Sequence, residues 1–139
     1  MEKDRFDGKK LLLSEAEWEK RLTPEQFRIL RHQGTEPSFC QSYFKIPKEK
    51  GYFECAGCGL PLFSSETKYD SGTGWPSFFA PLYPENVTYR EDRSLFEPRV
   101  EVVCSRCEGH LGHVFPDGPP PTGHRFCLNA AALKFTQTF

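Results

Sequence analysis

The chain has 139 residues, 37% of them hydrophobic, and its 18 basic and 19 acidic side chains leave a formal net charge of -1. The length fits one compact domain over 1–139, because domains most often contain roughly 100 to 150 residues. The charge balance argues against a nucleic-acid partner, since binding to a phosphate backbone draws on an excess of lysine and arginine. The leucine run at 11–13 is shorter than a signal-peptide core, and we expect a cytoplasmic chain with no membrane partner.

The first fifty residues predict a helical arm followed by a loop. Ser14 and Glu17 form the pattern of a capping box, which opens an amphipathic helix. Thr23 and Gln26 repeat the pattern, with Pro24 at the first helical position. Two short helices are the expected result.

Gly34 is a natural stop for the second of these helices, because glycine tolerates the left-handed conformation that ends many helices. The large apolar side chains of the arm are Trp18, Phe27 and Leu30. We interpret them as packing residues that hold the arm against the rest of the domain.

Residues 51–139 predict a mainly β domain. Glycine, proline, asparagine and aspartate recur every few residues, and the intervening stretches are rich in aromatic and β-branched residues. The proline-rich segment 117–123 must be a loop, because proline cannot donate to a strand ladder. The expected strands are 52–55, 87–89, 99–104, 112–115, 125–128 and 132–135.

Two Cys-x-x-Cys turns predict a metal site. Cys55 and Cys58 form one turn, Cys104 and Cys107 form the other, and a glycine soon follows each. One such pair could be a thioredoxin-like redox motif, but two pairs in one small chain of a reducing compartment favour a shared Zn²⁺ ion.

The predicted ion is structural. A saturated shell of four thiolates leaves no open position for substrate or water, which argues against a zinc hydrolase. Binding of one zinc per chain is expected to contribute on the order of 10 kcal/mol to folding.

Two cysteines remain outside this cluster, Cys40 and Cys127. Arg125 and Asn129 stand two residues on either side of Cys127, so an extended strand places all three side chains on one face. A guanidinium beside a thiol favours the thiolate, which is the nucleophilic form. His124 falls on the opposite face and is interpreted as peripheral.

Three sequence blocks give the chain a close resemblance to a known family. They are Ser-Gly-Thr-Gly-Trp-Pro-Ser-Phe at 71–78, Gly-His-Leu-Gly-His-Val-Phe-Pro-Asp-Gly at 109–118, and Arg-Phe-Cys-Leu-Asn at 125–129. Together with the two cysteine turns they resemble the methionine-R-sulfoxide reductases, the B class of methionine sulfoxide reductases. The resemblance implies two packed antiparallel sheets, zinc on the side away from the active site, and the N-terminal helices outside.

The resemblance also implies an enzymatic reaction. The cysteine that matches Cys127 attacks the sulfur of a methionine-R-sulfoxide, methionine leaves, and the cysteine becomes a sulfenic acid. Charge builds on the sulfoxide oxygen, so a proton donor is needed, and imidazoles donate near neutral pH. We expect His113 to be the principal acid, with His110 and Asn129 orienting it or binding the oxygen, although the sequence does not rank the two imidazoles.

Trp75 matches the family's indole that receives the terminal methyl group of the substrate, a role suited to a flat apolar ring that interacts well with sulfur. Arg125 is expected to lower the pKa of Cys127 or to position the site. The substrate is either free methionine sulfoxide or the oxidised residue in proteins, and the sequence leaves both open.

The sequence departs from the commoner family pattern at Thr73, where many members have a cysteine that resolves the sulfenic acid. Cys40 is the one thiol outside the zinc cluster and Cys127, so we predict that it forms the resolving disulfide, which thioredoxin or a similar dithiol reduces. Direct reduction of the sulfenic acid by an external thiol is the alternative.

Two other classes of function remain as alternatives. A non-catalytic zinc-stabilised β domain would need the four clustered cysteines, but not Cys127 with Arg125, Asn129 and both histidines. A nucleic-acid-binding zinc ribbon is disfavoured by the net charge and by the lack of a basic cluster.

Overall fold

The computed structural model describes residues 5–35, 50–93 and 98–137. Cys40, the predicted resolving cysteine, lies outside the described residues. The elements in chain order are α1 (Glu15–Arg21), α2 (Pro24–His32), β1 (Gly51–Cys55), β2 (Pro61–Ser64), β3 (Lys68–Tyr69), β4 (Ser77–Phe78), β5 (Val87–Asp92), β6 (Arg99–Cys104), β7 (His110–Phe115), β8 (Arg125–Leu128) and β9 (Leu133–Gln137). None of the described helices has the length and apolar character needed to cross a membrane.

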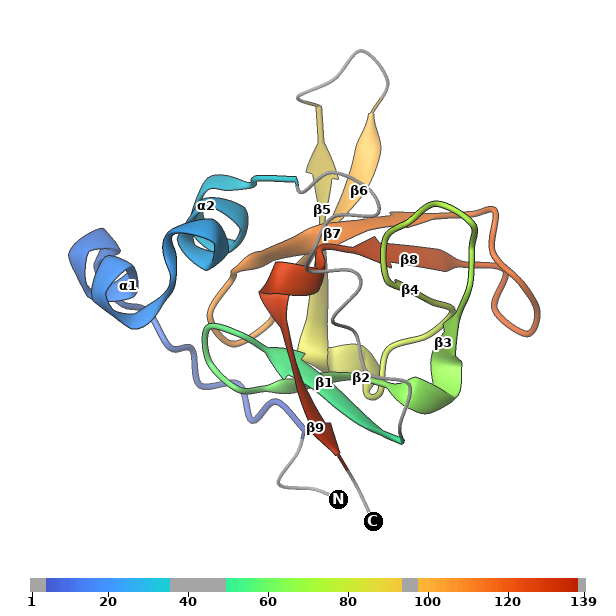
Figure 1. Ribbon diagram of the computed structural model, residues 1–139, viewed down its shortest axis with the longest axis horizontal. Helices are drawn as coiled ribbons and strands as arrows, with labels where there is room; N and C mark the ends of the chain where they lie inside the picture. Colours follow the sequence, from blue (N-terminus) through green and yellow to red (C-terminus); the bar gives the residue numbers. More distant parts are fainter. Residues whose placement is uncertain (1–4, 36–49, 94–97, 138–139) are drawn as a thin grey trace.

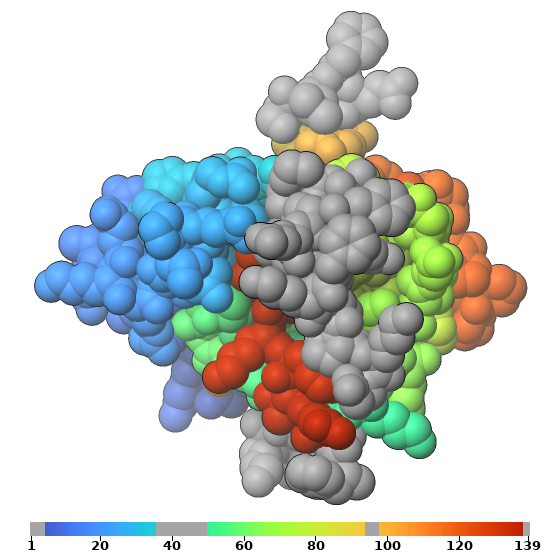
Figure 2. Space-filling view, in the orientation of Figure 1, coloured from blue at the N-terminus to red at the C-terminus, as the bar shows by residue number. Residues whose placement is uncertain are grey.

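The strands form two antiparallel sheets, as predicted. One has three strands in the order β2-β1-β9, and the other has six in the order β3-β4-β8-β7-β6-β5 (Figure 1). The helices form one end of the molecule, and the connection between β7 and β8 forms the opposite end (Figure 2).

Phenylalanine rings join the two sheets. Phe53 and Phe63 come from the small sheet, Phe78 and Phe126 come from the large one, and all four are at most 1% exposed. The rings of Phe63 and Phe78 stack with centroids 4.6 Å apart, and those of Phe53 and Phe78 meet edge-on at 5.2 Å. Burial of such large rings is the main apolar stabilisation available to a domain of this size.

Both predicted helices form, and each begins with its capping box. The side chain of Ser14 accepts from the backbone of Glu17 at α1, and Thr23 does the same for Gln26 at α2. The stop of α2 differs slightly from the prediction: Gln33, rather than Gly34, adopts the left-handed conformation, with φ of 52°. Of the expected packing residues, Trp18 and Leu30 are buried, whereas Phe27 is half-buried.

Six predicted strands are present, and β6 and β8 have the predicted bounds. The ninth strand begins one residue later than expected, because 130–132 form a short 3-10 helix. Sequence analysis missed β2, which starts at a proline, and also β3 and β4, which have two residues each. Two-residue strands carry no detectable alternation of polar and apolar residues.

One extra residue interrupts the pairing of β6 with β7. Glu101 pairs with His113 and Val102 with Gly112, but Val103 pairs with His110, so Leu111 is a β-bulge. His110 and His113 are three residues apart and would face opposite sides of a regular strand. The bulge places both imidazoles on the side of Glu101, with ring centroids 5.4 Å apart.

Candidate functional site

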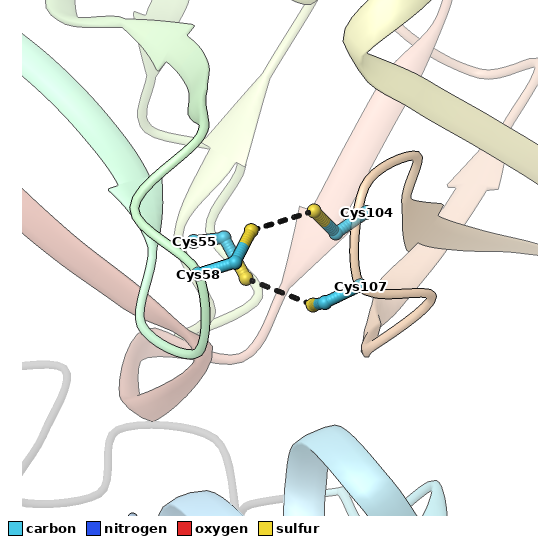
Figure 3. A group of neighbouring side chains, drawn as sticks. All are labelled: Cys55, Cys58, Cys104 and Cys107. Carbon is cyan, nitrogen blue, oxygen red and sulfur yellow. Dashed lines mark hydrogen bonds between the residues drawn. The ribbon is translucent and has the colours of Figure 1, made fainter. Parts of the chain in front are cut away.

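Four cysteines from the two predicted turns form a compact cluster. The Sγ atoms of Cys55, Cys58, Cys104 and Cys107 all lie within 4.8 Å of one another (Figure 3). The closest separations are 3.4 Å between Cys58 and Cys104 and 3.6 Å between Cys55 and Cys107. Sulfurs around a tetrahedral Zn²⁺ are about 3.8 Å apart when the Zn–S bonds are about 2.3 Å long. The cluster therefore has the dimensions of a four-thiolate metal site.

The two turns that carry these thiols have the same backbone design. In the first, Gly59 donates its N–H to the carbonyl of Cys55, and in the second Glu108 donates to Cys104. Both donors have positive φ, +81° for Gly59 and 61° for Glu108, which closes the turn after the second cysteine.

Arginines tie the turns to each other and to the helices. Arg106 of the second turn donates to the carbonyl of Cys58 at 2.7 Å, and Arg31 of α2 donates to the carbonyl of Cys107 at 2.8 Å. Hydrogen bonds from the thiols of Cys104, Cys107 and Cys55 lower the pKa of Cys58. The same contacts lower the pKa of Cys107 and raise those of Cys55 and Cys104, so they release protons from two sulfurs and hold protons on the other two. A bound divalent cation would take the place of these protons, because metal-bound cysteines are thiolates.

The fifth cysteine of the described residues, Cys127, lines a separate cavity of about 290 Å³. It stands on β8, in register with Ser77 of β4 on one side and His113 of β7 on the other. Phe126 points into the aromatic core, so its neighbours Arg125 and Cys127 face the cavity, as strand alternation predicts. Thr73, Trp75, His113, Leu128 and Asn129 also line it.

Burial and polar contacts act on the Cys127 thiol in opposite directions. Burial raises its pKa above the ordinary 9.0, while contacts with Thr73 and Arg125 lower it. Burial outweighs them, so the pKa is raised overall, although Arg125 acts on it in the expected, lowering direction. The guanidinium is held by two hydrogen bonds to Asp117, at 2.9 and 3.2 Å, and lies 4.5 Å from the ring centre of Phe115.

His113 is anchored by a carboxylate that sequence reasoning missed. Its Nε2 lies 2.7 Å from Asp92 Oδ2, and Arg99 donates to the same oxygen at 3.2 Å. Burial lowers the pKa of His113, and the carboxylate of Asp92 only partly opposes this, so the neutral imidazole is favoured. No motif marks Asp92 in the sequence; its position at the end of β5, in register with Arg99, is the feature that places it here.

His110 belongs to a neighbouring cluster. Its Nδ1 lies 2.7 Å from Glu101 Oε2, to which Gln33 also donates at 3.0 Å, and all three side chains border a polar cavity of about 460 Å³. Its Nε2 is buried and has no hydrogen-bond partner among the residues that the structure describes. His110 is not among the described residues that line the cavity of Cys127.

The remaining predicted residues have distinct positions. Asn129 donates through Nδ2 to the carbonyls of Leu111, at 3.2 Å, and Gly34, at 3.3 Å, and so connects the bulge to the segment after α2. Trp75 is half-buried at the cavity wall. His124, the residue before β8, is exposed and is not among the described residues that line the cavity.

Comparisons with known proteins identify the family of the chain. Residues 22–137 match the family model described as the SelR domain. The peptide methionine sulfoxide reductase MsrB of Methanosarcina barkeri is 56% identical over 122 residues, which cover 88% of this chain and 85% of the relative.

Two eukaryotic relatives are equally similar. Methionine-R-sulfoxide reductase B2, mitochondrial, of Rattus norvegicus is 56% identical over 133 residues, which cover 91% of this chain and 76% of the relative. Peptide methionine sulfoxide reductase B1, chloroplastic, of Arabidopsis thaliana is 57% identical over 123 residues, which cover 88% of this chain and 60% of the relative. The chain belongs to the SelR-domain family of methionine-R-sulfoxide reductases, the family that its three motifs indicate.

Proposed function

We propose that this protein reduces methionine-R-sulfoxide to methionine with Cys127 as the nucleophile. The observation that carries the proposal is the cavity in which Cys127, His113 and Trp75 meet, each contributed by a different motif. A thiol, an imidazole and an apolar ring are the three groups that the reaction requires. The names of the relatives quoted above support the same reaction.

In the first step the Cys127 thiolate attacks the sulfoxide sulfur, and the sulfoxide oxygen gains a proton. The oxygen is then transferred to the sulfur of Cys127: the sulfur–oxygen bond of the substrate and the sulfur–sulfur bond made by the attack break, a bond between the Cys127 sulfur and the oxygen forms, and the thioether of methionine leaves. One thiol and one sulfoxide thus become one sulfenic acid and one thioether, so the substrate gains two electrons from Cys127.

His113 is the proposed proton donor. The Asp92 carboxylate accepts at Nε2, which leaves Nδ1 as the ring nitrogen that exchanges a proton with the substrate. A neutral imidazole first takes up a proton from Cys127 or solvent and then delivers it to the oxygen. Asp92 and Asn129 act as positioning residues, and His110 supports this arrangement from the neighbouring cluster.

Recycling of the sulfenic acid is assigned to Cys40. The Cys40 thiol attacks the sulfenic sulfur, a disulfide to Cys127 forms, and water leaves. Thioredoxin or a similar dithiol then reduces this disulfide by exchange. Thr73 lies beside Cys127 at the position where many family members have the resolving cysteine, so another thiol must take that part.

The four-cysteine cluster fits one structural Zn²⁺ per chain, and the donor set of four thiolates is the one that zinc prefers at closed sites. None of its cysteines lines the cavity of Cys127. The ion would stabilise the junction of β1 with β6, and no reaction step depends on it.

Methionine-R-sulfoxide, free or within proteins, is the proposed substrate, and the single domain 1–139 is the proposed catalytic unit. A cytoplasmic location stays a prediction, since relatives of this chain include mitochondrial and chloroplastic proteins by name.

The test incubates the chain with separated R and S sulfoxides and dithiothreitol. We expect consumption of the R form alone, and no single turnover from Cys127→Ser despite an intact fold. The Cys40→Ser variant should still release one equivalent of methionine and lose most turnover with thioredoxin. Inertness of the wild-type chain toward both sulfoxides, or single turnover by Cys127→Ser, would refute the proposal.

A further inference from the structure

Three hydroxyl groups form a continuous row that ends at Cys127. Ser77 Oγ lies 2.7 Å from Ser71 Oγ, which lies 2.8 Å from Thr73 Oγ1. Thr73 Oγ1 in turn lies 4.0 Å from Cys127 Sγ. Ser77 is 1% exposed, so at that end the row is closed off from water.

Backbone amides restrict the direction in which this row can donate. Thr73 Oγ1 accepts from the N–H of Trp75 at 3.3 Å, and Ser71 Oγ accepts from the N–H of Thr73 at 3.4 Å. A hydroxyl has one proton and two lone pairs. Each of these two oxygens therefore has one lone pair occupied, and its remaining lone pair and its proton must point along the row in opposite directions.

The row consequently has two arrangements in which each of the three hydroxyls donates one hydrogen bond. With Cys127 as a thiol, the S–H donates to Thr73, Thr73 to Ser71, Ser71 to Ser77, and Ser77 to the carbonyl of Trp75, 3.1 Å away. With Cys127 as a thiolate, all three hydroxyls turn, and Ser77 donates to Ser71, Ser71 to Thr73, and Thr73 to the sulfur. The proton released by Cys127 goes to solvent, and the hydroxyl protons only rotate about their C–O bonds.

We propose that Ser77, Ser71 and Thr73 form a reversible hydroxyl relay that stabilises the thiolate of Cys127. The inference rests on Cys127 being the nucleophile of the proposed function. Thr73 is a positioning residue in this relay, and not only a position from which the resolving thiol is missing. Aligned hydroxyls polarise one another, so the terminal donor is stronger than an isolated threonine.

The relay acts on a sulfur whose protonation is also set by burial and by neighbouring charges. Charged and titratable side chains face Cys127 from several elements. They are Arg125 of β8, Asp117 of the loop between β7 and β8, Tyr69 of β3, His113 of β7 and Arg99 of β6. Burial favours the thiol and Arg125 favours the thiolate. A donor at the sulfur therefore shifts the fraction of thiolate directly.

The test measures alkylation of Cys127 by iodoacetamide against pH, followed by mass spectrometry of its peptide. Thr73→Val keeps the side-chain shape and removes the hydroxyl, and we expect alkylation at pH 7.5 to slow roughly tenfold, the size of one hydrogen bond to a charged group. Thr73→Ser keeps the hydroxyl, and its Cys127 should be alkylated at most of the wild-type rate. Ser77→Ala removes a group that does not touch the sulfur, and a fall of roughly twofold to threefold is expected if the row is aligned.

Thr136→Val is the matched control, because its hydroxyl bonds Glu54 on the small sheet, and it should leave the profile unchanged. Superposed pH profiles for wild type, Thr73→Val and Ser77→Ala, in variants with wild-type circular dichroism, would overturn the relay. If Thr73→Val and Ser77→Ala both failed to fold, a folded Thr73→Ser variant whose Cys127 alkylated roughly tenfold more slowly than wild type at pH 7.5 would also overturn it, because this variant keeps the hydroxyl. Alkylation does not require sulfoxide, so the two proposals can fail separately. Slower alkylation of Thr73→Val in a protein that does not reduce R-sulfoxide would support the relay alone, and reduction of R-sulfoxide with unchanged alkylation profiles would support the proposed function alone.

Discussion

The described cysteines occupy two environments that differ in what surrounds the sulfur. In the cluster at the ends of β1 and β6, each thiol has three other sulfurs within 4.8 Å. At Cys127 the neighbours are a hydroxyl, a guanidinium and a cavity. Both environments are largely buried, so burial alone does not separate a metal ligand from a nucleophile. The neighbouring groups separate the two roles. Four clustered thiolates are stabilised by a bound cation, whereas a single sulfur that lines a cavity can react with a substrate.

The largest test of this difference removes one sulfur from the cluster. Cys107→Ser should release the metal and lower the free energy of unfolding by several kcal/mol, up to about 10 kcal/mol, because metal binding is coupled to folding. Elemental analysis and urea denaturation measure both quantities. Cys127→Ser is the matched control and should keep about one equivalent of zinc. A stable, metal-free and active Cys107→Ser variant would contradict the structural role.

Loss of the proton donor affects only the second environment. His113→Ala should slow single-turnover reduction by about 10²-fold to 10⁴-fold, the usual range for a general acid, with metal content unchanged. Asp92→Asn keeps the imidazole and loosens its anchor, so a smaller loss is expected. His124→Ala removes an exposed imidazole and should have no effect. Equal rates for His113→Ala and His124→Ala would show that His113 is not the acid.

The pH dependence of alkylation sharpens the electrostatic side of the comparison. Because burial raises the pKa of Cys127 above 9.0, the thiolate is the minor form at neutral pH, and its fraction grows about tenfold per pH unit. Alkylation should therefore rise without a plateau from pH 6 to 9. Arg125→Met should raise the pKa of Cys127 further and slow alkylation several-fold at pH 7.5. Arg125→Lys keeps the charge, and its alkylation rate should lie between those of wild type and Arg125→Met. A plateau below pH 8 in the wild type would contradict the raised pKa.

The smallest expected effect concerns the helix that touches both environments. Arg31 of α2 bonds the carbonyl of Cys107, and Gly34 after α2 bonds Asn129 at the cavity. Thr23→Ala removes the capping hydrogen bond of α2 and should lower the free energy of unfolding by about 1 kcal/mol. Urea denaturation measures this, with Thr23→Ser as the control that keeps the hydroxyl. An unchanged midpoint would show that the cap does not limit stability.

Sequence reasoning identified the features that are local along the chain. The capping residues Ser14 and Thr23, the bounds of β6 and β8, and the two cysteine turns all depend on residues a few positions apart. Strand alternation likewise places Arg125 and Cys127 on the side of β8 opposite Phe126, and Asn129, which follows the strand, also lines the cavity.

Features set by sheet order could not be predicted in this way. Asp92 meets His113 across β6, and Ser77 meets Cys127 only because β4 pairs with β8. The pairing partners of a two-residue strand leave no signal in its own residues. The separation of His110 from the cavity of Cys127 likewise depends on Glu101, which lies on a different strand.

The bulge at Leu111 changes how spacing along the chain should be counted. His110 and His113 are an odd number of positions apart in the sequence, yet they are an even number apart in the sheet, because one residue between them has no partner. The surplus residue is itself used, since the carbonyl of Leu111 accepts from both the backbone and the side-chain nitrogens of Asn129. Shortening this strand by one residue would keep the two imidazoles on one face and still deprive Asn129 of its anchor.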